Sequence, residues 1–160
     1  MKKEYDKETR KQILQKKIAW QAVKNHWKIL DGNGLVVHQI YEQIPELEVI
    51  YQTYLSIWQT MTPTEKIPIS IKGEQRYQEI AKKMHLEIGK QYYVKWDGWV
   101  LIELTNVQTA VEQLWNGGEG FLLLDTQIHT IKDVDMDSGD EYHISIYIWD
   151  FGQIDEQKYL

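Results

Sequence analysis

The residues best able to do chemistry lie between positions 132 and 143, where the chain reads KDVDMDSGDEYH and holds four aspartates and one glutamate. Such a segment can bind calcium, form a solvated loop or attract a basic partner. A calcium loop of the EF-hand type needs acidic ligands at positions 1, 3 and 5, glycine at 6 and glutamate at 12. Counted from Asp133, position 6 is Ser138 and position 12 is Ile144. We therefore predict no calcium site, which leaves a solvated loop and a partner-binding surface as alternatives.

A catalytic or metal site elsewhere in the chain is the second possibility. The chain has no cysteine, and its five histidines show no compact metal-ligand spacing. It has no phosphate-binding or nucleophile motif, since the glycines of NGGEG at 116–120 follow a helix-like segment instead of preceding one. We expect no catalytic residue, metal or cofactor. The alternative is a small enzyme or ligand-binding domain whose polar groups converge in the fold, with the candidates Glu103, His129, Asp133 and His143.

The charge of the chain is unevenly distributed around a formal net charge of −6. Residues 1–95 contain 16 Lys and Arg against 11 Asp and Glu, a balance of +5, whereas residues 96–160 contain 2 against 13, a balance of −11. An acidic surface repels phosphate backbones and attracts basic proteins over long distances. We therefore expect a basic protein as the partner and no nucleic acid. We interpret the basic N-terminal residues as a solvated helix face.

The first half of the chain has mainly the pattern of helices, because apolar residues recur at helical spacing. The predicted helices are residues 5–30, a segment from Pro45 to just before Pro63, and residues 73–84. Proline suits the first turn of a helix, which supports the start at Pro45. Residues 35–41 are either a short strand or the approach to the second helix, and residues 67–71 form a short strand.

The clearest local signal is a β-hairpin in the middle of the chain. The strand-like runs YYVKW and WVLIEL flank Asp97-Gly98, a pair that tolerates the positive φ angles of a two-residue type I′ turn. Thr105 and Gln108 then form a capping-box pattern, which predicts a helix from there to Trp115. The segment Asn116-Gly117-Gly118 would end that helix with a left-handed cap.

Two further strands complete the predicted fold, a buried one over 121–125 and a half-exposed one over 143–150. In the second strand the isoleucines share one face, and Ser145, Tyr147 and Trp149 share the other. Helices come first, and a hairpin, a helix and further strands follow. This order predicts an α+β fold in which N-terminal helices pack with a mainly antiparallel β-sheet, as a single domain over 1–160.

The same sequence contains no apolar run of membrane-spanning length and no apolar segment of the signal-peptide type. We therefore expect a soluble, cytoplasmic protein with no membrane partner. The absence of cysteine suits a reducing compartment.

Aromatic residues are the last unusual feature, with seven Trp and ten Tyr. Exposed aromatics are enriched in protein interfaces, whereas a second layer packed over the Tyr147 and Trp149 face would make those two part of the core. The residues that we predict to bind a partner are Asp133, Asp135, Asp137, Asp140, Glu141, Tyr142, Trp96 and Trp99. They are not assigned to catalysis.

In size, acidity and lack of catalytic motifs the chain resembles the small cysteine-free α+β immunity proteins and antitoxins that neutralise bacterial toxins. This resemblance implies an inhibitor that binds a basic toxin, for example a nuclease. Toxic nucleases need basic clefts for phosphate, and an inhibitor with clustered carboxylates meets such a cleft with complementary charge and fast association. The resemblance transfers no functional residue.

Overall fold

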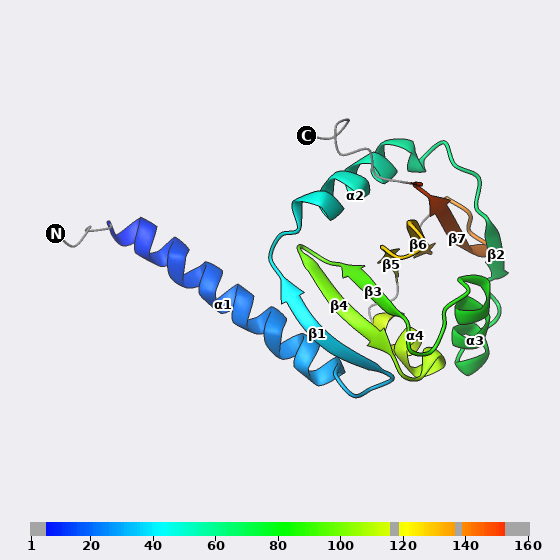
Figure 1. Ribbon diagram of the computed structural model, residues 1–160, viewed down its shortest axis with the longest axis horizontal. Helices are drawn as coiled ribbons and strands as arrows, with labels where there is room; N and C mark the ends of the chain where they lie inside the picture. The colour runs from blue at the N-terminus through cyan, green and yellow to red at the C-terminus, as the bar shows by residue number, and fades with distance from the viewer. Residues whose placement is uncertain (1–5, 116–118, 137–138, 153–160) are drawn as a thin grey trace.

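The computed structural model describes residues 6–115, 119–136 and 139–152, which form four helices and one seven-stranded sheet (Figure 1). The helices are α1 (Lys7–Leu30), α2 (Pro45–Trp58), α3 (Glu74–Lys83) and α4 (Val107–Trp115). The strands are β1 (Leu35–Tyr41), β2 (Glu65–Pro68), β3 (Gln91–Lys95), β4 (Trp99–Leu104), β5 (Gly120–Asp125), β6 (Thr130–Asp135) and β7 (His143–Asp150). The predicted α+β class is confirmed.

The sheet has the strand order β1-β4-β3-β5-β6-β7-β2, and every neighbouring pair is antiparallel. Helix α2 covers one face, where its residue Tyr54 packs with Trp99 and Tyr147 of the strands. Helices α3 and α4 cover the other face, where α3 packs on the β7 isoleucines. Strand β7 is therefore covered on both faces, and the prediction that it is half exposed was wrong.

The hairpin of β3 and β4 is confirmed, but its predicted turn is not. Lys95 pairs with Trp99, so the loop between them is Trp96-Asp97-Gly98, and neither Asp97 nor Gly98 has a positive φ. Gly98 is needed for space, because a Cβ there would collide with the carbonyl oxygen of Tyr41. Glycine in this position lets the end of β1 approach the hairpin closely.

Two other local predictions are shifted. Helix α4 is capped by Asn106 and not by Thr105, because the Asn106 Oδ1 accepts a hydrogen bond of 3.1 Å from the Thr109 amide. Strand β2 begins at Glu65, two residues before the predicted start. The predicted glycine cap at 116–118 lies outside the described residues.

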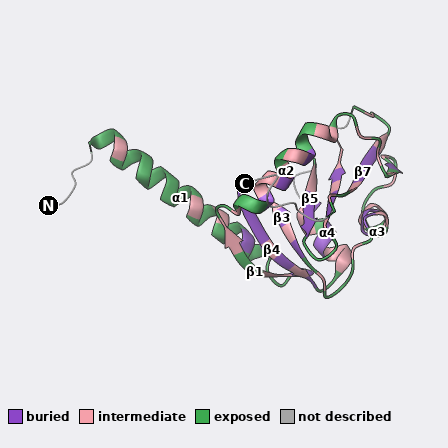
Figure 2. Ribbon diagram, turned by 45° about the horizontal axis from the view of Figure 1, so that its top comes forward, coloured by how far each residue is buried: buried purple, intermediate pink, exposed green. Residues whose placement is uncertain are grey.

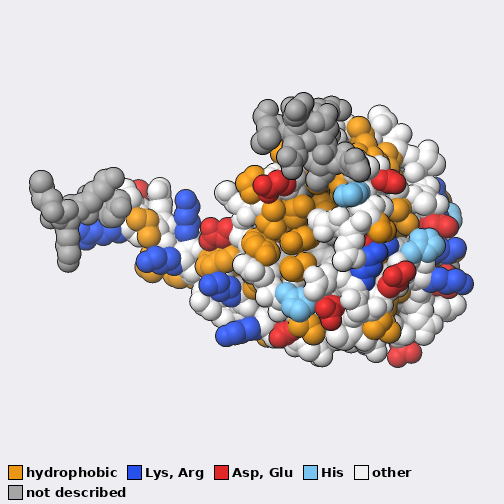
Figure 3. Space-filling model, viewed as in Figure 1, with side chains coloured by type: hydrophobic (Ala, Val, Ile, Leu, Met, Phe, Trp, Pro, Cys, Tyr) orange, Lys and Arg blue, Asp and Glu red, His pale blue; other side chains and the backbone are white. Residues whose placement is uncertain are grey.

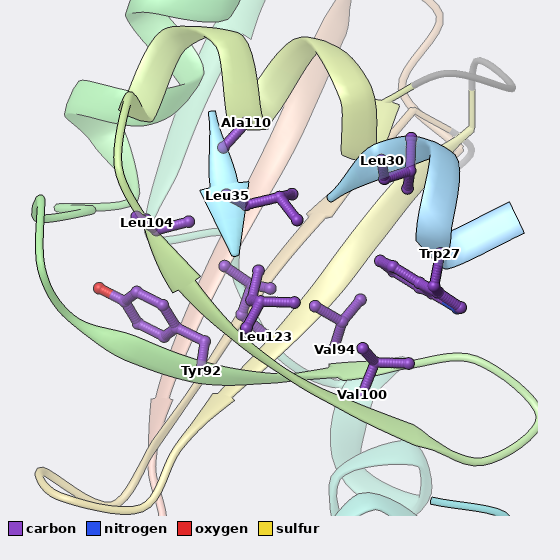
Figure 4. Packing of buried hydrophobic residues seen from close by; sticks show 10 residues of the cluster. Trp27, Leu30, Leu35, Tyr92, Val94, Val100, Leu104, Ala110 and Leu123 are labelled. Carbon is purple, nitrogen blue, oxygen red and sulfur yellow. The ribbon is translucent and has the colours of Figure 1, made fainter. Parts of the chain in front are cut away.

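Helix α1 is anchored at one end and projects from the body at the other (Figures 1 and 2). Trp27 and Leu30 are buried against Val100 and other residues of the sheet (Figure 4). Trp20 stacks on Trp96 with ring centroids 5.9 Å apart. The segment before Trp20 is mostly exposed, so α1 consists of a packed half and a free half.

Candidate binding site between α2 and the sheet

A pocket of about 350 Å³ lies between α2 and the β5–β6 part of the sheet. Its floor comes from the two strands, its wall from α2, and β3 contributes one lysine. The lining residues are Tyr51, Leu55, Trp58, Lys95, Glu119, Gly120, Phe121, Leu122, Asp133, Val134 and Asp135. We refer to this site as the Asp133 pocket.

Two carboxylates of β6 lie on the same floor because residues two apart in a strand share a face. Asp133 and Asp135 both line the pocket, whereas Val134 between them packs toward α3 and α4. Asp133 Oδ2 accepts a hydrogen bond of 2.7 Å from the hydroxyl of Tyr54, a fully buried residue of α2. This bond ties the carboxylate to the helix that covers it.

Burial changes the acidity of this pair. Burial of the Asp133 carboxyl raises its pKa to about 7, the hydrogen bond from Tyr54 opposes the rise, and the negative charge of Asp135 adds to it. Burial, followed by the Asp133 charge, raises the pKa of the Tyr54 hydroxyl, so Tyr54 stays a hydrogen-bond donor. Asp133 therefore changes its charge near neutral pH.

Aromatic rings and one ammonium group form the sides of the Asp133 pocket. The Lys95 Nζ lies 5.0 Å from the ring centroid of Tyr51 and 5.2 Å from that of Trp99. It also donates to Glu48 Oε2 at 3.3 Å, so its charge is already paired. The Trp58 Nε1 is buried without a hydrogen-bond partner among the described residues. The pocket thus combines aromatic walls with an acidic floor, which suits a cationic group.

A second, smaller pocket of about 270 Å³ lies on the other side of Trp58. Its lining includes Lys66 and Asp140, whose Nζ and Oδ2 atoms are 2.9 Å apart. The hydrogen bond from Lys66, followed by that from the Tyr142 amide, holds the pKa of Asp140 well below its ordinary value. Asp140 is thus an ionised, ion-paired residue of the surface beside the Asp133 pocket.

The predicted partner-binding residues do not form one continuous patch. Asp133 and Asp135 lie in the pocket, Asp140 lies beyond Trp58, and Glu141 and Tyr142 are exposed next to it. Tyr142 is the most exposed of the large hydrophobic residues described, at 74%. Asp137 lies outside the described residues.

The two hairpin tryptophans are not exposed anchors. Trp99 is 0% exposed and belongs to the core under α2, so its assignment to a partner-binding surface was wrong. The next residue, Val100, packs with Ala110 of α4, so the ring of Trp99 lies on the opposite face of the sheet, which α2 covers. Trp96 is half-buried and stacks on Trp20.

The four candidate groups of the alternative enzyme site are dispersed. Glu103 on β4 is separated from β6 by two strands and lies 3.4 Å from the His38 Nε2. His129 lies in the turn between β5 and β6, and His143 contacts Asp140 at 3.1 Å. Asp133 is the member of this set that lines the Asp133 pocket. Within residues 6–115, 119–136 and 139–152, no three His, Asp or Glu side chains lie close enough to hold a metal ion.

The pocket also contains residues that the sequence did not indicate as functional. Tyr54 and Trp58 recur at helical spacing with other apolar residues of α2, which is the ordinary pattern of a core face. Tyr51 and Lys95 carried no signal of their own. Their convergence depends on how α2 crosses the sheet.

No protein-family model matches the chain, and comparisons with curated proteins and with solved structures give no match either. Within the described part of the chain, no helix combines the length and apolar character needed to cross a membrane.

Proposed function

We propose that this protein is an immunity-protein-like or antitoxin-like inhibitor that binds and neutralises a basic toxin, for example a nuclease. The observation that carries the proposal is the Asp133 pocket, where two carboxylates form the floor between the aromatic rings of Tyr51 and Trp58. A lysine or arginine side chain of the toxin fits this chemistry, because carboxylates accept charge-assisted hydrogen bonds and aromatic faces attract cations.

The surrounding acidic residues would act mainly on the rate of association. Glu119, Asp140 and Glu141 lie around the two pockets, and residues 96–160 have a charge balance of −11. Such a field steers a basic partner and is screened by salt. The carboxylates of the pocket floor are instead desolvated on binding, and they would act mainly on dissociation. The proposal includes a cytoplasmic location, which suits a chain without cysteine.

The experiment that tests this function uses the product of the gene next to the one that encodes this chain, because a toxin and its inhibitor are expected to be encoded side by side. It compares the dissociation constant of this product for the wild-type chain and for the variant Asp133→Asn/Asp135→Asn. We expect the double variant to raise the dissociation constant about 30-fold or more, which corresponds to about 2 kcal/mol. The matched control is Glu74→Gln/Glu112→Gln, which removes the same charge from α3 and α4 on the opposite side of the sheet. The control should change the constant by less than about threefold.

The pH and salt dependence of the same dissociation constant distinguishes the contribution of the Asp133 pocket from that of the surrounding acidic residues. Binding should weaken from pH 8 to pH 6, because Asp133 with a pKa of about 7 loses its charge over this range. The double variant should lose this dependence and keep the salt dependence. Equal binding by the wild-type chain and the double variant would show that the pocket is not the toxin site.

A further inference from the structure

The Asp133 pocket already contains one cation of this chain, the ammonium group of Lys95. Its Nζ lies over the ring of Tyr51 and donates at 3.3 Å to Glu48 Oε2 and at 3.3 Å to the carbonyl of Asp97. Among the described residues that line the pocket Lys95 is the one basic residue, and the basic side chains of α1 lie along a helix that projects from the body (Figure 3). The place over Tyr51 that suits a compact ammonium is therefore filled.

The floor of the pocket suits a donor that is wider than an ammonium. Asp133 and Asp135 are two residues apart on β6, which separates them by about 7 Å along the strand. The hydroxyl of Tyr54 donates to Asp133 Oδ2 and so fixes the direction of this carboxylate. A guanidinium has five N–H donors in a flat fork and can bond two carboxylates at once, whereas an ammonium is a point charge.

The wall of the pocket favours a flat cation for a second reason. Trp58 lines the pocket, and its ring packs edge-on against Tyr147 with centroids 5.9 Å apart, which holds it in place. A guanidinium stacks on aromatic rings and is more weakly hydrated than an ammonium, so it loses less when it enters a partly buried site. A metal ion does not fit, because the described residues contain no group of three His, Asp or Glu that could hold one.

We propose that the Asp133 pocket selects an arginine side chain of the partner over a lysine side chain, and that Lys95 determines this selection. The inference rests on the proposed function, which makes the partner a basic protein. An arginine bonds the floor carboxylates and stacks on Trp58 without using the place over Tyr51. A lysine needs a place that Lys95 has taken, and it meets the charge of Lys95 there.

Two small probes test the selection, Nα-acetyl-arginine amide and Nα-acetyl-lysine amide, because each has a blocked backbone and one positive charge. Each probe is titrated into the full chain by NMR at pH 8, where Asp133 is mostly ionised. We expect the arginine probe to bind with a dissociation constant of about 1–5 mM, which is reasonable for a ligand of this size. The lysine probe should bind at least about tenfold more weakly.

The variant Asp133→Asn/Asp135→Asn should raise the dissociation constant of the arginine probe at least about tenfold, because both floor charges are removed. The matched control Glu74→Gln/Glu112→Gln should change it by less than about threefold. These two variants show whether the probe binds in the pocket or to the general negative charge of the chain.

The role of Lys95 is tested by the ratio of the two dissociation constants. Lys95→Gln vacates the place over Tyr51, so the lysine probe should gain affinity and the ratio should fall below about threefold. Lys95→Arg keeps this place filled by a cation and should keep the ratio near tenfold. The ratio is the readout because the unpaired Glu48 attracts both probes alike. Thermal unfolding checks that each variant is folded, and the wild-type ratio tests the selection without any variant.

Equal dissociation constants for the two probes in the wild-type chain would overturn the selection, and so would no binding of the arginine probe up to about 50 mM. A ratio that stays the same in Lys95→Gln would overturn the role of Lys95. The probes need no toxin, so a preference for arginine without binding of the neighbouring gene's product would contradict the proposed function alone. Binding of that product through the pocket without a preference for arginine would contradict this inference alone.

Discussion

At the scale of single residues, Asp133 has two roles that conflict at neutral pH. Burial of its carboxyl under α2 and the neighbouring charge of Asp135 favour the neutral form, whereas the hydrogen bond that it accepts from Tyr54 and the binding of a cation in the pocket favour the charged form. The structure accommodates both because the pKa is raised to about 7. The charged form of Asp133 therefore has two effects: it lowers the stability of the fold, and it is the form that binds a cation.

This conflict predicts a pH-dependent stability. Between the ordinary Asp pKa of 3.8 and about 7, the folded chain holds a proton on Asp133 that the unfolded chain has lost. This proton contributes to the free energy of unfolding at low pH. The contribution is lost as the pH rises through that window, which lowers the free energy of unfolding by at most about 4 kcal/mol. Asp133→Asn should therefore gain stability relative to the wild type from pH 5 to pH 8, as measured by urea unfolding.

The matched control is Glu112→Gln, an exposed carboxylate on α4. Its stability should follow the wild-type pH curve in parallel. If the curve of Asp133→Asn also stayed parallel to the wild type, the carboxyl of Asp133 would be ionised throughout and the raised pKa would be wrong.

At the scale of elements, Lys132 joins α3 to the sheet. The side chain is 3% exposed, and its Nζ donates a hydrogen bond of 3.0 Å to the carbonyl of His85 just after the end of α3. It also lies 5.7 Å from the ring centroid of Tyr92. Burial, followed by the charge of Lys90, lowers the pKa of this ammonium. A cation at the C-terminal end of a helix is favourable, which offsets part of the cost of burial.

We predict that Lys132→Ala destabilises the fold by about 2–4 kcal/mol, because it removes a buried four-carbon stem and a partner of a helix end. Lys132→Met keeps most of the stem and should recover about half of this loss. The control Lys82→Ala, at an exposed position of α3, should stay within about 0.5 kcal/mol of the wild type. Equal effects of the Ala and Met variants in urea unfolding would show that packing of the stem contributes little.

Strand β6 also shows where sequence patterns fail. Most helices and strands were predicted because their apolar residues recur with one period, as in the isoleucines of β7. In β6 the buried Ile131 and Val134 lie on opposite faces, and the buried Lys132 and the half-buried Asp133 lie between them. The partners that satisfy these two charged groups are 47 and 79 residues away in the chain. No local pattern contains them, so the segment was interpreted as part of an acidic loop.

The candidate site was half predictable for a related reason. The acidic residues were evident from composition, and two of them do lie in the pocket. The aromatic wall was not evident, since an aromatic residue on a helix face reads as core until the opposing surface is known. Trp99 was predicted to be exposed to a partner. This was wrong because both faces of the hairpin are covered, one by α2 and the other by α4.

At the scale of the whole molecule, the structure consists of a two-sided core and an arm. The central strands are covered by α2 on one face and by α3 and α4 on the other, while the first half of α1 is mostly exposed (Figure 2). Stability should therefore be distributed unevenly, because buried hydrogen bonds open with the global transition and exposed ones open locally.

Hydrogen exchange followed by mass spectrometry tests this distribution. In a dilute solution of about 1 µM, amides of residues 7–19 should exchange within about tenfold of the rate of an unstructured peptide. Amides of β5 and β6 should exchange slowest, since they open with the whole core. Trp27→Ala removes the anchor of α1 and should extend the fast exchange from residues 7–19 to residues 20–30, while β5 keeps its ranking as one of the slowest strands. Slow exchange of residues 7–19 in the dilute wild-type chain would mean that the free half of α1 is stabilised within one copy, and the division into core and arm would then be wrong.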